Sequence, residues 1–136
     1  MVDINISYTG GLRCRAVHAP SGNALITDAP VDNKGKGETF SPTDLVAAAF
    51  GACLATIMGI IADQENVDLT GMDVHVVKEM TTTPPRRIAR LATRVTVPCA
   101  LTPKQKAKFE HAAKACPVAQ SLHPGIETPI EFVYPR

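Results

Sequence analysis

The stretch from Ser41 to Asp63, SPTDLVAAAFGACLATIMGIIAD, decides the fold of this 136-residue chain. Ser41 suits the N-cap of a helix, Pro42 suits its first position, and Asp44 completes a capping box three residues after the cap. A helix over this stretch would be about 34 Å long at 1.5 Å per residue. No charged residue occurs between positions 45 and 62, so the helix is apolar on every side. Such a helix belongs either in a protein core or in a membrane.

The membrane alternative has little support from the composition of this stretch. The uncharged run only reaches the lower end of the roughly 17–25 residues that a spanning helix needs, and small Ala and Gly residues dilute it. No aromatic belt and no flanking cluster of Lys and Arg frames it. We therefore expect a buried central helix and no membrane partner.

Cys53 lies in the middle of this stretch among apolar neighbours. Phe50, Ile57 and Ile60 share its helical face, at spacings of three, four and seven residues. Taken alone, this is the setting of an inert core cysteine. The small residues nearby allow another element to approach closely, and so long an apolar helix is hard to cover within so small a chain. We therefore expect a second copy of the chain to pack there, giving a homodimer.

The composition of the chain restricts its class. Its length suits a single domain, 1–136, that can bury a proper core. The formal net charge of +1 gives no support to a nucleic-acid partner. The opening MVDINISYTG lacks the basic and apolar regions of a signal peptide, so we expect the reducing cytoplasm. The four Cys and four His residues are scattered without C-x-x-C spacing, so we expect no metal site and no cofactor.

Alternating apolar and polar residues predict strands on both sides of the long helix. We expect them at 3–8, 12–17 and 24–27, with a turn at Gly10-Gly11, and again at 72–80, 88–97 and 126–134. Shorter helices are expected to begin at 103 and to cover 118–122, which makes the fold α+β. Arg13 and Arg15 fall on one face of the second strand. They are either solvated charges or a pair of guanidinium groups near an anion.

Cys116 stands directly before Pro117, at the point where a second helix should break. Pro117 can start a short helix, which leaves Cys116 at its N-terminal cap. A thiol at a helix N-terminus is biased toward the thiolate. On local grounds Cys116 is therefore a better candidate for a reactive thiol than Cys53, with an ordinary packed or capping cysteine as the alternative.

Two segments together resemble the paired cysteine motifs of the OsmC/Ohr family, the osmotically inducible protein C and organic hydroperoxide resistance proteins. They are SPTDLVAAAFGAC, which ends at Cys53, and AAKACPVAQSL, which contains Cys116. The opening YTGGLRCRAVHAPSG and the segment ITDAP are similar to the OsmC-like branch. The resemblance spans nearly the whole chain. It implies an OsmC-like fold, in which antiparallel sheets wrap around long central helices in an intertwined homodimer.

The same resemblance implies a chemistry. Cys53 matches the peroxidatic cysteine and Cys116 the resolving cysteine of a thiol-dependent peroxidase that defends against oxidative stress. The substrate class implied is an organic hydroperoxide, which an apolar pocket would favour over hydrogen peroxide. An external thiol would reduce the resulting disulfide, and no metal or organic cofactor is needed.

The sequence departs from the Ohr pattern at two positions that serve the reactive thiol. A buried thiol resists ionisation and needs a cation nearby. Leu12 stands directly after Gly10-Gly11 where the Ohr branch has an arginine, and Thr43 stands ten residues before Cys53 where it has a glutamate. Arg13 or Arg15 could replace this arginine, and Glu38 or Asp44 could replace the glutamate. We expect Arg13 to serve, from the same chain or its partner, and Cys14 and Cys99 to be structural.

These departures keep a second function class open. A dimeric OsmC-like protein could use the same cleft to bind a small apolar ligand, with cysteines that react slowly or not at all. The absence of a glutamate ten residues before Cys53 favours this alternative.

Overall fold

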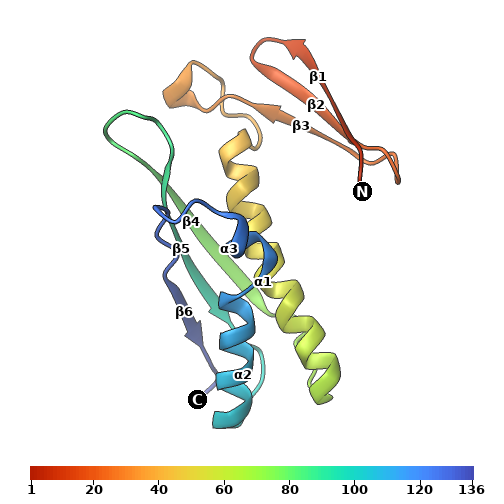
Figure 1. The fold of residues 1–136 in the computed structure, drawn as a ribbon, viewed down its shortest axis with the longest axis vertical. Helices are drawn as coiled ribbons and strands as arrows, with labels where there is room; N and C mark the ends of the chain where they lie inside the picture. Colours follow the sequence, from red (N-terminus) through yellow and green to blue (C-terminus); the bar gives the residue numbers. More distant parts are fainter. The chain divides into compact units, whose positions relative to one another are not determined.

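A computed structural model describes residues 1–136 and shows an α+β fold (Figure 1). The chain forms two compact units, Met1–Val46 and Ala47–Arg136, which are described in turn. The first is built on a three-stranded sheet and the second on another three-stranded sheet with the long helix.

The sheet of the first unit is an antiparallel meander, as the sequence predicts. Its strands are β1 (Ile4–Gly10), β2 (Arg13–His18) and β3 (Ala24–Asp28), in the order β1-β2-β3. The turn between β1 and β2 needs positive φ at three successive residues, 89° at Gly10, 61° at Gly11 and 63° at Leu12. Two glycines at these positions keep the conformational energy of the turn low, because glycine adopts positive φ without a steric clash.

One face of this sheet is apolar and exposed. The register pairs Ile6 with Ala16 and Ala16 with Leu25, so their side chains lie on the same face. Ile6 is 62% exposed and Tyr8, further along β1 on that face, is 67% exposed. The opposite face carries Arg13, Arg15 and Asp28.

A tight loop follows β3. It contains the short 3₁₀ turn η1 (Val31–Asn33) and folds back on Ala29, whose carbonyl accepts a hydrogen bond of 3.2 Å from the N–H of Gly37. A Cβ atom at Gly35 would collide with the carbonyl oxygen of Ala29, so no larger residue fits there. The loop leads into the long helix.

The long helix α1 (Pro42–Glu65) begins with the predicted capping box. Asp44 Oδ2 accepts the N–H of Ser41 at 2.8 Å, and Ser41 Oγ accepts the N–H of Asp44 at 3.1 Å. The helix ends at Asn66, which has a φ of 55°. An asparagine in the left-handed region is a common stop for a helix.

The sheet of the second unit is mixed. β4 (Asp73–Met80) and β5 (Ile88–Thr96) pair antiparallel, and β6 (Ile130–Val133) pairs parallel with β5. The implied purely antiparallel arrangement does not hold here, because parallel neighbours need a long crossover and this chain provides one. The crossover carries α2 (Pro103–Lys114) and α3 (Pro117–Ser121). β6 is shorter than predicted, since Pro129 cannot donate a backbone hydrogen bond.

The core of the second unit lies between the sheet and the helices. α1 contributes Phe50, Leu54 and Met58, which are almost fully buried, and Leu91 and Phe109 join them from β5 and α2. The middle of α2 is tied to the end of α1 by an ion pair of 2.6 Å between Lys108 and Glu65. Figure 1 shows α1 (yellow to green) and α2 (light blue) alongside β4 and β5.

Only one face of α1 is buried, although the sequence predicts a helix that is buried all round. The other face carries an exposed stripe of Ala49, Ala52, Thr56 and Ile60, and Ile60 is 49% exposed. By length and composition alone, α1 could cross a membrane, with a mean hydropathy of 2.3 over its most apolar part. Core helices meet the same criterion, and the burial of Leu54 against the sheet agrees with that role.

Gly51 sets the distance between α1 and β4. A Cβ atom at Gly51 would lie 3.0 Å from Cγ2 of Val76 and 3.4 Å from Cγ1 of Val74. A β-carbon is at the limit of what fits, and a longer side chain would push the helix off the strand.

We expect the substitution Gly51→Leu to lower the free energy of unfolding by about 1–3 kcal/mol, because overpacking a tight core costs this much. Urea unfolding followed by circular dichroism at fixed protein concentration would measure it. The matched control is Gly59→Ala in the same helix, where an added Cβ meets no atom within 4 Å. That variant should gain stability, by up to about 1 kcal/mol. Equal stability of Gly51→Leu and the wild type would contradict close packing at this point.

Candidate functional site

Cys53 lies in the middle of α1, at the border between its buried and exposed faces. Phe50 and Leu54 beside it are buried, while Ala52 and Thr56 are exposed, and the side chain of Cys53 itself is half-buried. The thiol is therefore accessible, but its surroundings are apolar. The sequence predicts a thiol that is enclosed by apolar side chains, whereas the structure encloses it on one side only.

Cys116 lies between α2 and α3, where the sequence predicts a break. It forms the N-cap of α3, with extended backbone angles of φ −63° and ψ 152°, and Pro117 is the first residue of the helix. Its Sγ accepts a hydrogen bond of 3.5 Å from the N–H of Ala119. Unlike Cys53, Cys116 is completely buried.

Burial raises the pKa of the Cys116 thiol above its ordinary value of 9.0. The hydrogen bond from Ala119 acts in the opposite direction but is outweighed, and the neighbouring Cys53 raises the pKa further. The expectation that the helix N-terminus biases Cys116 toward the thiolate is therefore wrong. Desolvation of a fully buried sulfur exceeds the effect of one short helix.

The structure brings Cys53 and Cys116 together, although they are far apart in sequence. Cys53 is a neighbour of Cys116, and its side chain is one cause of the raised pKa of Cys116. All four cysteines of the chain, including Cys14 and Cys99, are free thiols. The pair thus combines one accessible thiol with one buried thiol as its neighbour.

Arg13 belongs to a cluster of charges in the first unit. Its Nη2 donates to Glu38 Oε2 at 2.6 Å and to Asp28 Oδ2 at 3.3 Å. Of the two carboxylates expected beside the arginine, Glu38 is thus in contact with it, while Asp44 is engaged in the capping box of α1. Arg15 lies on the same face of β2 and is exposed.

Asp28 is the residue of this cluster that the sequence analysis missed. It is 1% exposed, and its pKa is lowered from the ordinary value of 3.8, chiefly by a hydrogen bond from the backbone N–H of Glu38 and also by Arg13. The sequence does hold a signal for this residue, because a hairpin of β2 and β3 pairs Arg13 directly with Asp28. Cross-strand neighbours of opposite charge are expected to interact.

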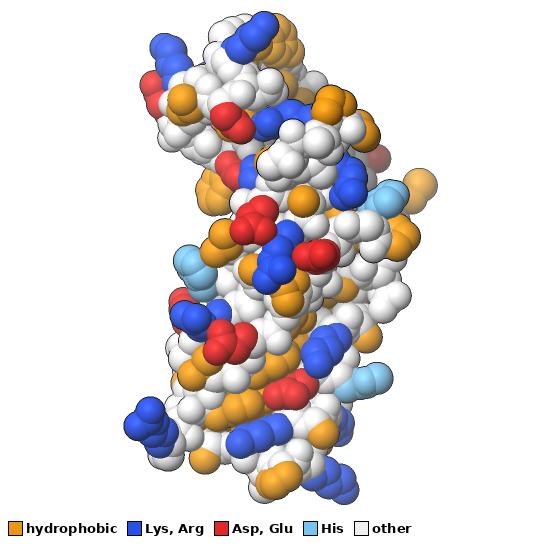
Figure 2. Space-filling view, turned by 90° about the vertical axis from the view of Figure 1, so that its left-hand side faces the viewer, with side chains coloured by type: hydrophobic (Ala, Val, Ile, Leu, Met, Phe, Trp, Pro, Cys, Tyr) orange, Lys and Arg blue, Asp and Glu red, His pale blue; other side chains and the backbone are white.

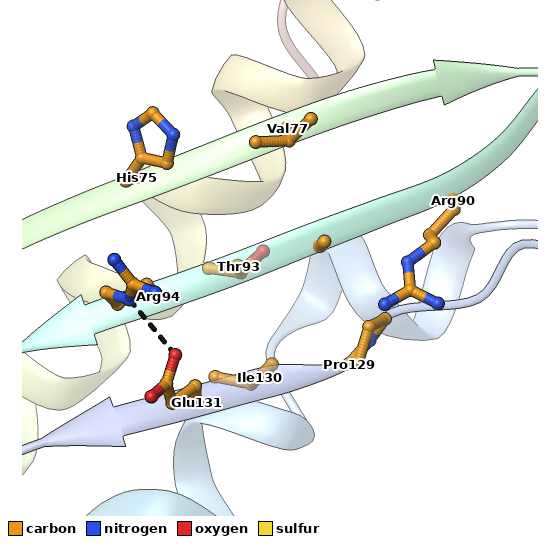
Figure 3. A pocket seen from close by; sticks show the side chains of 9 residues that line it. His75, Val77, Arg90, Thr93, Arg94, Pro129, Ile130 and Glu131 are labelled. Carbon is orange, nitrogen blue, oxygen red and sulfur yellow. Dashed lines mark hydrogen bonds and ion pairs between the residues drawn. The ribbon is translucent and has the colours of Figure 1, made fainter.

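A separate hollow of about 410 Å³ lies on the face of the second sheet that points away from the helices (Figure 3). Val77 and Ile130 line its apolar part, and Arg94 beside them is paired with Glu131 at 3.0 Å. Arg90, at the other end, is paired with Glu79 and Glu127. The charges in this hollow are balanced, so it shows no preference for an ionic ligand.

No strongly charged patch is found on the face drawn in Figure 2, and no cluster of metal-ligating side chains is found among the groups of the chain. Basic and acidic side chains are interspersed on the face drawn in Figure 2, without a large patch of one sign. No group of three or more His, Cys, Asp or Glu side chains could hold a metal ion. The pair of thiols and the arginine cluster are therefore the candidate functional groups.

Comparison with known proteins identifies the family. The sequence model of OsmC-like proteins matches residues 35–131, which include both Cys53 and Cys116. The chain belongs to the OsmC-like family. A search of curated proteins found no match.

Solved structures agree with this assignment. A protein from Psychrobacter arcticus 273-4, named for osmotic stress induction and a detoxification response, is 42% identical, with a TM-score of 0.92 over 97% of this chain and 96% of that one. An organic hydroperoxide resistance protein OsmC from Legionella pneumophila is 16% identical, with a TM-score of 0.77 over 98% and 96%. An organic hydroperoxide resistance protein from Elizabethkingia anophelis is 12% identical, with a TM-score of 0.78 over 99% and 96%. The last two show a shared OsmC-like fold.

We expect iodoacetamide to alkylate Cys53 at least ten times faster than Cys116 at pH 8, because Cys116 is buried and its pKa is raised. Peptide mapping by mass spectrometry at several times of reaction would measure both rates. Alkylation of Cys116 should rise only above pH 9, since the thiolate is the reacting form and its pKa lies above the ordinary value of 9.0. Equal rates at the two positions at pH 8 would contradict this asymmetry.

Proposed function

We propose that this OsmC-like protein is a thiol-dependent peroxidase that reduces organic hydroperoxides through a two-cysteine cycle. The observation that carries the proposal is that the half-buried Cys53 and the completely buried Cys116 are neighbours in the fold. A two-cysteine cycle needs one thiol that a substrate can reach and a second that is shielded until the first has reacted.

The atoms and electrons of this cycle balance without a cofactor. The Cys53 thiolate attacks the terminal oxygen of R–O–O–H, the O–O bond breaks, and with one proton the alcohol R–OH leaves and Cys53 becomes a sulfenic acid. The Cys116 thiol then displaces the hydroxyl group as water and forms an S–S bond with Cys53. An external thiol reductant supplies the two electrons that restore both thiols.

The apolar side chains beside Cys53 support a substrate with a hydrocarbon portion. Ile57, four residues along the same helical face as Cys53, is apolar and partly exposed. Such a surface gains free energy from an alkyl or aryl group but gains nothing from hydrogen peroxide.

In this proposal Arg13 supplies the positive charge that favours the Cys53 thiolate, and Glu38 orients the arginine. Two features of the cluster support this role. Both ion pairs of Arg13 use the same nitrogen, Nη2, so its Nε and Nη1 donors remain for another acceptor. Arg13 is also partly exposed, at 34% of its side chain, so a ligand can reach it.

We expect one equivalent of cumene hydroperoxide to remove two of the four thiols of each chain within seconds, because one turnover converts Cys53 and Cys116 into a disulfide. Titration with Ellman's reagent under denaturing conditions, before and after the peroxide, would count them. The double variant Cys14→Ser with Cys99→Ser is the control and should also lose two thiols. Cys53→Ser should lose none at that rate.

A thiol count that does not change after the peroxide would separate the two function classes. Unchanged thiols in the wild type would overturn the peroxidase proposal. They would favour the alternative of a binding protein for a small apolar ligand, for which Thr43 in place of a glutamate is the sequence argument.

We also propose that the functional form is a homodimer. Two apolar surfaces in this chain lack a cover, the stripe of α1 at Ala52 and Ile60 and the apolar face of the first sheet at Ile6 and Tyr8. Large exposed apolar surfaces mark interfaces, and the small residues of α1 suit a close, symmetric contact.

We expect the wild type to sediment as a dimer at micromolar concentration and Ile6→Asp to shift the equilibrium toward the monomer at least tenfold, because a buried unpaired charge is costly. Ser7→Asp, on the opposite face of β1, is the matched control and should remain a dimer. A reducing agent should change neither result, since burial of apolar surface holds the subunits. A folded wild-type monomer would contradict the proposal.

A further inference from the structure

Asp28 is an unusual residue in the first unit, because it is a buried carboxylate that is only partly satisfied. It is the last residue of β3 and lies opposite Arg13 in the register of the sheet. Its Oδ1 atom is buried and has no hydrogen-bond partner. A buried acceptor without a partner costs free energy, so the stability of this unit alone does not explain the residue.

The other carboxylate oxygen joins two structural elements. Asp28 Oδ2 accepts one hydrogen bond from Nη2 of Arg13, at 3.3 Å, and another from the backbone N–H of Glu38, at 3.1 Å. The same Nη2 donates to the Glu38 side chain at 2.6 Å. Asp28 therefore holds both the arginine and the backbone of the residue that pairs with it.

The backbone around Asp28 makes this arrangement stiff. The N–H of Asp28 donates to the carbonyl of Phe40 at 3.0 Å, and the N–H of Ala29 donates to the carbonyl of Leu12 at 3.2 Å. These bonds tie both ends of the loop and the turn before Arg13 to the end of β3. A guanidinium held by two carboxylates on such a frame loses most of its rotational freedom.

We propose that Asp28 is a positioning residue for the thiol chemistry: its carboxylate fixes Arg13 and the Glu38 backbone together, so that the free Nε and Nη1 donors of Arg13 point in one direction. This rests on the proposed function, in which Arg13 favours the reactive thiolate. Glu38 alone is exposed and on a loop, so it could hold Arg13 only loosely. Positioning of this kind is a recognised way to prepare a charge for catalysis without reorganisation.

The first measurement is the second-order rate constant for oxidation of Cys53 by cumene hydroperoxide. We expect Asp28→Ala to lower it about tenfold, and Arg13→Met to lower it by roughly ten- to a hundredfold, which corresponds to one or two pKa units of thiol ionisation. Asp28→Asn keeps an oxygen that can accept from Arg13 and Glu38, and should recover most of the loss. Arg15→Met, on the same face of β2, should stay within twofold of the wild type.

The matched structural control is Thr39→Val. Thr39 Oγ1 donates to the carbonyl of Ile26 at 3.5 Å, so this variant also removes a side-chain hydrogen bond between the loop and β3 but does not touch Arg13. It should leave the rate within twofold of the wild type. A tenfold loss in Thr39→Val would mean that any loosening of the loop has this effect, and would overturn the specific role of Asp28.

A double-mutant cycle separates positioning from a general structural defect. If Asp28 acts through Arg13, the double variant Asp28→Ala with Arg13→Met should be no more than twofold slower than Arg13→Met alone. A merely structural role would make the two losses multiply, to a hundredfold or more. Multiplied losses, or a wild-type rate in Asp28→Ala, would overturn the inference while leaving the peroxidase proposal intact.

A readout independent of peroxide distinguishes the two proposals. The rate of Cys53 alkylation by iodoacetamide, measured from pH 5 to 10, reports thiolate formation directly. We expect Asp28→Ala and Arg13→Met to shift this profile to higher pH, and Asp28→Asn to shift it less. Should the wild type leave peroxide unreduced while these shifts occur, the peroxidase proposal fails and the positioning role stands. Unshifted profiles in both variants would overturn the positioning role.

Discussion

The contact of α1 with β4 at Gly51 fixes the place of Cys53. Because a Cβ atom at Gly51 would lie 3.0 Å from Cγ2 of Val76, helix and strand pack tightly at this point. This contact turns Leu54 and Met58 inward and leaves Cys53 at the edge of the buried face. A thiol one position further round the helix would be either sealed in the core or fully exposed. The exposure of Cys53 therefore depends on where a glycine allows the helix to lie.

The two thiols differ because two kinds of local structure hold them. Cys53 is on a regular helix, where position on the face decides exposure, and Cys116 is a cap at a junction that the core covers completely. A raised pKa keeps Cys116 protonated and hence weak as a nucleophile. In a cycle with two thiols this difference enforces the order of events, since only the accessible sulfur meets an external oxidant.

Much of this architecture could be predicted from the sequence, because it depends on local signals. The capping box at Ser41 and Asp44, the glycine turn after β1 and the break at Pro117 all involve residues a few positions apart. The pairing of Cys53 with Cys116 could not be derived from spacing, and came only from resemblance to a family.

Other features depend on contacts between residues far apart in sequence, and these were either not predicted or predicted wrongly. The parallel pairing of β6 follows from a crossover whose path no local pattern records. The pKa of Cys116 depends on burial by side chains from several elements, which outweighed a correct argument about the helix terminus. Asp28 was overlooked since a single aspartate at a strand end is unremarkable until the register places it beside Arg13.

The crossover between β5 and β6 also has a consequence for how the chain folds. Contacts between residues close in sequence form early, whereas a parallel pair closed by a long connection forms slowly, because the loop entropy must be overcome first. α1, β4 and β5 can associate before α3 and β6 dock. In a chain that folds in this order, Cys53 has no neighbouring thiol until the junction that carries Cys116 docks, and its vulnerability to cross-linking depends on the speed of that last step.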